Sequence, residues 1–204
     1  MTPARLRIVK VGGSLFDLPD LAQRMRTFLR DEIVACDILI AGGGALVDQV
    51  RQLHDKNPID HTRAHWICVE LMSITARLLT ERLGLESVPT DIDELPPLDA
   101  PSLQTFDASK WLRHVEPITN GTQLPIGWEV TSDSIAARLA TTLGAEELVL
   151  LKSALPADTD IRQMAEDGYV DSAFPTFAAE LPTIRFVNLR DASSLLVRRT
   201  QDQT

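Results

Sequence analysis

Two glycine-rich turns contain residues whose types and spacing suit the handling of a phosphoryl group. The first turn is Gly12-Gly13-Ser14, preceded by Lys10, and the second is Gly42-Gly43-Gly44. Glycine lets a backbone approach a ligand closely, and the helix that follows each turn offers unpaired N–H groups and a partial positive charge to an anion. Two such turns at neighbouring strand ends predict a cradle that holds a phosphoryl group from two sides.

Other phosphate-binding patterns fit this sequence less well. The second turn has glycines at the first two places of a dinucleotide-binding fingerprint, but Val47 stands at the third place. A P-loop with its Lys-Ser/Thr pair is absent from the sequence. A nicotinamide-dependent oxidoreductase is therefore a weaker alternative.

The hydrophobic pattern predicts the elements that position these turns. Short β-branched runs that end at glycines indicate buried parallel strands, and stretches with apolar residues at helical spacing follow them. This alternation is typical of βαβ units, so we expect an α/β fold, a three-layer αβα sandwich with a mainly parallel central sheet. The predicted strands are 6–11, 38–41, 148–151 and 184–188, and the predicted helices are 18–31, 45–54, 62–83, 107–112, 135–143 and one that starts near Asp191 and leads to a polar tail at 198–204. Residues 89–101, rich in proline and acidic residues, are expected to form a loop, and 118–127 to form turns with extended pieces.

Composition and charge exclude several classes of function. The chain has 204 residues and a net charge of −9 without a basic stripe, which argues against binding to nucleic acid. No apolar run approaches the ~20 residues of a membrane span, and the N-terminus has no signal-peptide pattern. Cys36 and Cys68 lie in apolar contexts, and no Cys/His spacing resembles a metal site. We therefore expect a cytoplasmic protein with buried, reduced thiols and no metal ligands of its own.

Three motifs in this order resemble the amino acid kinase family: Lys10-Val11-Gly12-Gly13-Ser14, Ala41-Gly42-Gly43-Gly44 and Ser132-Asp133-Ser134-Ile135-Ala136. The resemblance covers about residues 5–153. It implies ATP-dependent phosphoryl transfer to a carboxylate, phosphate or hydroxyl oxygen, with Mg²⁺ carried by the nucleotide. It also implies that Lys10 contacts the transferring group, that N–H groups of the glycine turns stabilise its oxygens and that Asp133 orients the lysines.

The resemblance further implies how the chain is organised. Residues 1–204 would form a single domain, in which about 1–130 make the acceptor and phosphoryl side and about 131–204 make a shortened nucleotide side. Family members often form dimers, so a homo-oligomer is expected. Two alternatives stay open at this point: Asp133 could be a plain helix N-cap, and Lys10 could be a surface lysine at a strand edge.

The sequence departs from the family pattern after the strand 148–151. Many members have a Thr/Ser-Asp-Val-Asp-Gly turn that contacts the nucleotide, whereas this chain reads Lys152-Ser153-Ala154-Leu155-Pro156. We assign Lys152 the role of the second family lysine, at the leaving phosphate; the alternative is a structural lysine paired with Asp133 or a carbonyl. The altered turn also leaves open a non-catalytic protein that binds a small molecule or anion and retains the kinase fold.

Four residues are predicted to lie on the acceptor-substrate side: His65, Trp66, Trp128 and Ser132. The segments Ala64-His65-Trp66 and Trp128-Glu129-Val130-Thr131-Ser132-Asp133-Ser134 resemble the methanofuran-biosynthesis branch of the family. In that branch the acceptor is an aminomethylfuran-methanol phosphate, which is converted to its diphosphate. The alternative for the histidine and the two tryptophans is packing in the core.

Overall fold

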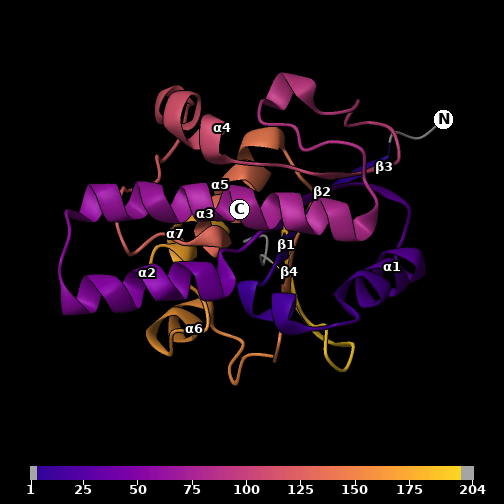
Figure 1. Cartoon of the computed structure of the whole chain (residues 1–204). Coiled ribbons are helices and arrows are strands. Elements are labelled where there is room, and N and C mark those ends of the chain that lie inside the picture. The colour runs from indigo at the N-terminus through magenta and orange to yellow at the C-terminus, as the bar shows by residue number, and fades with distance from the viewer. Residues whose placement is uncertain (1–3, 199–204) are drawn as a thin grey trace, which may run out of the picture.

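The computed structural model describes residues 4–198, which form a six-stranded sheet between two layers of helices (Figure 1). The strands lie in the order β3-β2-β1-β4-β5-β6, and all neighbours are parallel except β5 and β6. This arrangement confirms the predicted three-layer αβα sandwich. The strands are β1 (Arg5–Val11), β2 (Ala35–Ala41), β3 (Ser102–Thr105), β4 (Glu147–Lys152), β5 (Thr183–Asn188) and β6 (Ser193–Arg198).

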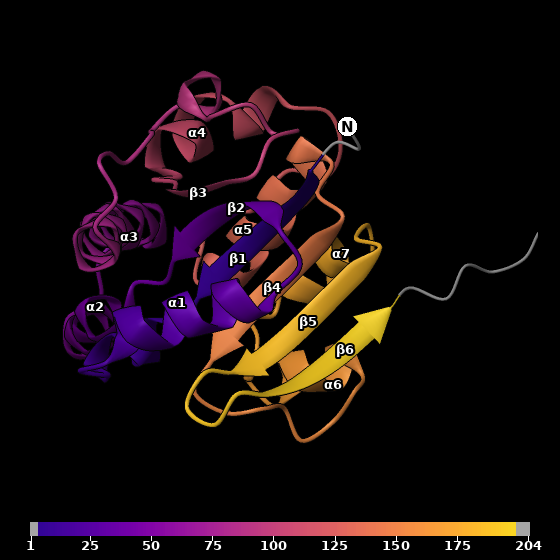
Figure 2. The same cartoon turned by 90° about the vertical axis from the view of Figure 1, so that its right-hand side faces the viewer.

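Helices cover both faces of the sheet (Figure 2). On one face, α1 (Leu21–Asp31) and the C-terminal half of α3 (His61–Leu83) pack on alternate apolar residues of β1, β2 and β4. On the other face, α5 (Ser132–Leu143) packs on the intervening apolar residues of the same strands, together with parts of α4 and α7. The remaining helices are α2 (Gly44–Lys56), α4 (Ser109–His114), α6 (Ile161–Glu166) and α7 (Phe174–Ala178), with 3₁₀ turns η1 (Gly13–Asp17), η2 (Ile92–Glu94) and η3 (Glu116–Ile118).

The predicted last helix, starting near Asp191, is wrong. The chain instead turns back after β5 and forms β6, which pairs antiparallel with β5. Asp191 drives this turn because its carboxylate accepts a hydrogen bond from the Ser193 N–H at 2.9 Å, while Ala192 adopts a positive φ of 62°. Along β6, exposed residues then alternate with half-buried ones, which is the period of a strand. The predicted polar tail lies outside the described residues from position 199 onward.

Several short elements are not predicted by the sequence pattern, namely β3, α6 and α7. β3 extends the sheet beyond β2 as a short parallel edge strand. The helix predicted at 107–112 occurs two residues later, as α4, and Asp107 accepts a hydrogen bond from the Ser109 N–H at its start. The region 118–127 contains no strand: η3 opens it, and turns and irregular backbone follow.

Two further expectations can be compared with the described residues. Between residues 4 and 198, no helix combines the length and the apolar character that a membrane crossing requires. Both cysteines are free thiols, but only Cys36 is buried, and Cys68 on α3 is half-buried. Burial raises the pKa of both thiols.

Candidate active site

The two glycine-rich turns are in direct contact at the carboxyl ends of two neighbouring strands. β1 and β2 are parallel neighbours, so their carboxyl ends and the turns that follow them lie side by side. A Cβ atom added to Gly13 would lie only 2.2 Å from the backbone nitrogen of Gly44, so no larger residue fits between the turns. A pocket of about 190 Å³ opens beside them, lined by Gly13, Ser14, Gly42, Gly43, Gly44, Val47, Asp48, Arg51, Thr131 and Ser132.

A matched pair of glycine substitutions tests this close approach. Gly44 and Gly84 both adopt left-handed backbone, with φ of 55° and 70°, but only Gly44 has backbone atoms in the way of a side chain, 2.6 Å from the Gly13 oxygen. Gly84→Ala should therefore cost only the left-handed penalty of about 1–2 kcal/mol, with normal ligand binding. Gly44→Ala should lower the free energy of unfolding, measured in urea, by more than this. It should also weaken phosphate binding measured by calorimetry. Equal effects of the two substitutions would contradict the contact between the turns.

Lys10, Asp133 and Lys152 meet beside the turns. Because successive strand residues point to opposite faces, Lys10 follows Ile8 on the face of β1 that α5 covers, and Lys152 follows Leu150 on the same face of β4. Asp133, in the first turn of α5, contacts both: its Oδ1 lies 2.8 Å from Lys10 Nζ, and its Oδ2 accepts a hydrogen bond from Lys152 Nζ at 2.7 Å.

The electrostatics of this trio favour the ionised carboxylate. Burial alone would raise the pKa of Asp133, but the charges of Lys10 and Lys152 lower it to about 2. At Lys152 the balance is different, because burial and the charge of Lys10 outweigh the attraction of Asp133 and lower the pKa of the ammonium group. Two cations thus share one anion within the trio, and the nearby carboxylate of Asp171 also attracts Lys152.

This lowered pKa predicts how stability changes in acid. Since the folded pKa of about 2 lies below the ordinary 3.8, the ionised Asp133 contributes stability at pH values above the ordinary pKa, and this contribution is lost as the pH falls towards the folded one. Denaturant unfolding at about pH 5 and about pH 3 measures the free energy of unfolding at both pH values. This free energy should fall less between the two for Asp133→Asn than for the natural protein. The same loss of free energy of unfolding in both proteins would contradict an ionised Asp133 carboxylate in the folded protein.

The structure bears on the alternative interpretations of these three residues. Lys10 is 4% exposed and is not a surface lysine. The N-cap of α5 is Thr131, whereas the Asp133 carboxylate points to the lysines. Lys152 does pair with Asp133 and also donates to the Tyr169 carbonyl oxygen at 2.7 Å, as the structural alternative requires. These contacts bring the three residues together, and the catalytic roles of all three stay predictions.

The other predicted site residues divide into two groups. Ser14 and Ser132 line the pocket, and the Ser14 hydroxyl lies 3.2 Å from that of Ser153. His65 and Trp66 do not line it. His65 Nδ1 contacts the carbonyl and the N–H of Gly127, so it fixes the loop before Trp128, and Trp66 packs against the core under the guanidinium of Arg113.

Trp128 does not line the pocket either. It lies next to Arg51, which the sequence patterns do not predict as a site residue. The guanidinium of Arg51 lies 5.9 Å from the indole centroid, and Arg51 and Asp48 both line the pocket. Gly44, Asp48 and Arg51 have the spacing of one helix face. This spacing is the sequence signal that could have predicted Asp48 and Arg51 beside the second glycine turn. Asp171, which bonds to residues on both sides of Asp133, has no such local signal.

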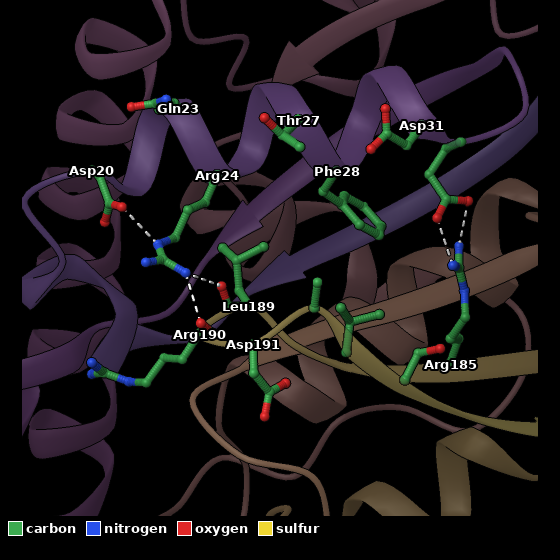
Figure 3. A pocket seen from close by; sticks show the side chains of 14 residues that line it. Asp20, Gln23, Arg24, Thr27, Phe28, Asp31, Arg185, Leu189, Arg190 and Asp191 are labelled. Atoms are coloured by element: carbon green, nitrogen blue, oxygen red, sulfur yellow. Dashed lines mark hydrogen bonds and ion pairs between the residues drawn. The ribbon is translucent and has the colours of Figure 1, made fainter.

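A larger cavity, of about 520 Å³, lies elsewhere, between α1 and the β5–β6 hairpin (Figure 3). It contains none of the predicted site residues. Its three arginines are already paired: Arg185 with Glu32, Arg24 with Asp20 and with the carbonyl oxygens of Leu189 and Arg190 (Figure 3), and Arg190 with Asp17. The pocket at the glycine turns is smaller, but its lining residue Ser132 directly precedes Asp133 of the lysine–aspartate trio, and we take it as the candidate site.

Comparison with known proteins shows the family to which the chain belongs. The sequence profile of the amino acid kinase family matches residues 5–154, which include both glycine turns and the lysine–aspartate trio. The chain therefore belongs to the amino acid kinase family. No curated protein matches the chain.

Similar solved structures share the fold at low sequence identity. UMP kinase from Ureaplasma parvum is 13% identical, with a TM-score of 0.61 over 96% of this chain and 99% of that one. UMP kinase from Bacillus anthracis is 16% identical, with a TM-score of 0.61 over 96% and 100%. Uridylate kinase from Archaeoglobus fulgidus is 18% identical, with a TM-score of 0.51 over 76% and 69%. Family membership and this fold support a kinase-like phosphotransferase.

Proposed function

We propose that this protein transfers a phosphoryl group from ATP to a small phosphorylated or carboxylated metabolite. The observation that carries the proposal is the trio of Lys10, Asp133 and Lys152, in which two ammonium groups share one buried carboxylate, beside two glycine turns that touch each other. Phosphoryl transfer needs little covalent work from a protein; it needs positioning and stabilisation of negative charge. The trio and the N–H groups of the turns supply both.

Each group has a stated part in this proposal. Lys10 contacts the transferring phosphoryl group, and the remaining backbone N–H groups of the two turns stabilise its oxygens. The N–H groups of Gly12 and Gly42 are not available for this, because they donate to the carbonyl oxygens of Leu151 and Val11 at 2.8 and 2.9 Å. Lys152 has three N–H bonds, of which two are used by Asp133 and Tyr169, so one is left for the leaving phosphate. Asp133 holds both ammonium groups in place.

Mg-ATP would supply the phosphoryl group and a divalent charge on its oxygens. The described residues, 4–198, contain no group of three or more His, Cys, Asp or Glu side chains that could hold a metal ion. Lysines and backbone N–H groups bind phosphate oxygens rather than cations, so this donor set fits a nucleotide that brings its own Mg²⁺. The protein side of the site would meet the phosphates, and the nucleotide would hold the ion.

We propose an aminomethylfuran-methanol phosphate as the acceptor, in methanofuran biosynthesis. The pocket lining beyond the turns offers the Arg51 guanidinium for the phosphate and the Asp48 carboxylate for the ammonium group of such a molecule. The Trp128 ring does not line the pocket, but it lies 5.9 Å from the Arg51 guanidinium and is the nearby aromatic group for the furan. Arg51 Nη1 and Asp48 Oδ1 lie 3.3 Å apart. Both side chains are partly exposed, so each can exchange this partner for the ligand.

Product formation tests the proposal. The protein is incubated with Mg-ATP and, separately, the aminomethylfuran compound, UMP and a set of small phosphates and carboxylates. We expect ADP formation that depends on an acceptor, with the diphosphate as product for the aminomethylfuran compound. Turnover with another acceptor would exclude the methanofuran assignment and keep the kinase, and the absence of ADP with every acceptor would count against the kinase.

The second candidate function is a non-catalytic protein that binds a small anion. Two observations favour it: the 152–156 turn lacks the acidic residues and the glycine of the family, and Lys152 is held by Tyr169 as well as by Asp133. Such a protein would bind phosphate at the turns without binding Mg-ATP. Calorimetric titration with the two ligands separates the candidates.

A further inference from the structure

We infer that the segment Tyr169–Asp171 is a clamp that fixes Asp133 and Lys152 relative to each other, with Asp171 as a positioning residue for phosphoryl transfer. This inference rests on the proposed function. The segment lies outside residues 5–154, where the family profile matches. It therefore adds a part to the site that the family motifs do not contain.

Asp171 binds the chain on both sides of Asp133. On the N-terminal side, its Oδ2 accepts hydrogen bonds from the Thr131 N–H at 3.0 Å and the Thr131 hydroxyl at 2.8 Å. On the C-terminal side, the same oxygen accepts from the Ser134 N–H at 3.0 Å, and Oδ1 accepts from the Ser134 hydroxyl and from the Phe174 N–H. A single carboxylate thus fixes the residues that precede and follow Asp133.

Tyr169 holds the other partner, Lys152. Its carbonyl oxygen accepts a hydrogen bond from Lys152 Nζ at 2.7 Å, and its ring lies 4.8 Å from the same nitrogen. Its hydroxyl donates to the Ala154 carbonyl at 2.9 Å and so ties the turn after β4 to the clamp. Residues 169 and 171 therefore hold the lysine and the aspartate from one short piece of backbone.

The charges around Asp171 indicate that its carboxylate has a specific use. Burial and the nearby charge of Asp133 raise the pKa of Asp171, so the ionised form is disfavoured by its surroundings. The groups that face it are Asp133 on α5 and Lys152 at the end of β4, together with the five donors from Thr131, Ser134 and Phe174. Only an oxygen acceptor with several lone pairs can satisfy these donors, and an amide at this position would turn an N–H towards some of them.

The test replaces Asp171 by asparagine, with Asp160→Asn as a matched control. Asp160 caps α6 in the same part of the chain, where its carboxylate accepts from the Arg162 N–H, and it does not touch Thr131 or Ser134. We expect Asp171→Asn to lower kcat about 100-fold, since small displacements of positioned groups cost this much, with an unchanged KM for the acceptor. Asp160→Asn should leave both constants unchanged.

Lysine reactivity gives a readout that does not depend on turnover. The chain has four lysines, and acetylation of each by acetic anhydride can be followed by mass spectrometry of peptides. Lys10 and Lys152 should react slowly in the natural protein because they are paired and mostly buried, and Lys152 should react several-fold faster in Asp171→Asn. Lys56 and Lys110 are exposed and should not change.

The outcomes separate this inference from the proposed function. If the natural protein transfers no phosphoryl group, the proposed function fails, and the acetylation of Lys152 alone decides on the clamp. Normal kcat with unchanged Lys152 reactivity in Asp171→Asn would overturn the clamp. If that variant does not fold, Ser134→Ala carries the test: it removes one donor to Asp171 and should move kcat and Lys152 reactivity in the same directions by smaller amounts.

Discussion

Replacing Lys10 by methionine is expected to lower the rate of phosphoryl transfer by about 100- to 1,000-fold, because it removes a preorganised positive group from the site where charge develops. Methionine has similar length and is apolar, so it fills the same buried space beside Asp133 without an ammonium group. Steady-state kinetics with Mg-ATP and the acceptor that the product-formation test identifies measures the effect. The loss should be in kcat rather than in the KM of the acceptor.

The control for this substitution is Lys56→Met, which removes an exposed lysine at the end of α2. It should leave kcat unchanged. Lys10→Met should remain folded, since Asp133 keeps its hydrogen bond from Lys152. A folded Lys10→Met protein with normal kcat would contradict the assignment of Lys10 to the transferring group.

Replacing Asp133 by asparagine is expected to abolish activity and to destabilise the fold at the same time. Without the carboxylate, two buried ammonium groups face each other with no anion between them. Removing one partner of a buried ion pair typically costs about 3–5 kcal/mol. Urea unfolding monitored by circular dichroism measures the loss of stability.

A double substitution separates the two effects. Lys10→Met combined with Asp133→Asn removes one of the two ammonium groups that would be left without a partner, so it should be less destabilising than the sum of the single substitutions. It should remain inactive. Strictly additive losses of stability would show that the two side chains do not interact, which would contradict the 2.8 Å contact.

The fold could be predicted where the chain signals structure locally. β1, β2, β4 and β5 are apolar runs in a β-branched context, and Gly84 and Gly144 end α3 and α5 in left-handed backbone as expected. β6 could not be predicted in this way. Its apolar core is only Leu195-Leu196-Val197, and its pairing with β5 depends on a turn held by one aspartate and one positive-φ alanine.

The same distinction applies to the candidate site, because local patterns predict some of its residues and others take their role only from packing. The sequence predicts the glycine turns and Lys10 because each is a short local pattern at the end of a strand. The family resemblance predicts His65 and Trp66 at the substrate, but α3 turns His65 to the backbone of Gly127 and Trp66 to the core. No local pattern predicts Asp171, because its role exists only after α5 and the segment before α7 have packed together.

The most direct test of the central claim, that ATP brings a phosphoryl group to the glycine turns, is a calorimetric titration of the protein with Mg-ATP, which needs no knowledge of the acceptor. We expect Mg-ATP to bind at one site per chain, with weaker binding in Lys152→Ala and in Gly44→Ala and unchanged binding in Gly84→Ala. Absence of Mg-ATP binding by the folded natural protein would contradict the kinase and leave the anion-binding protein as the function that fits the site.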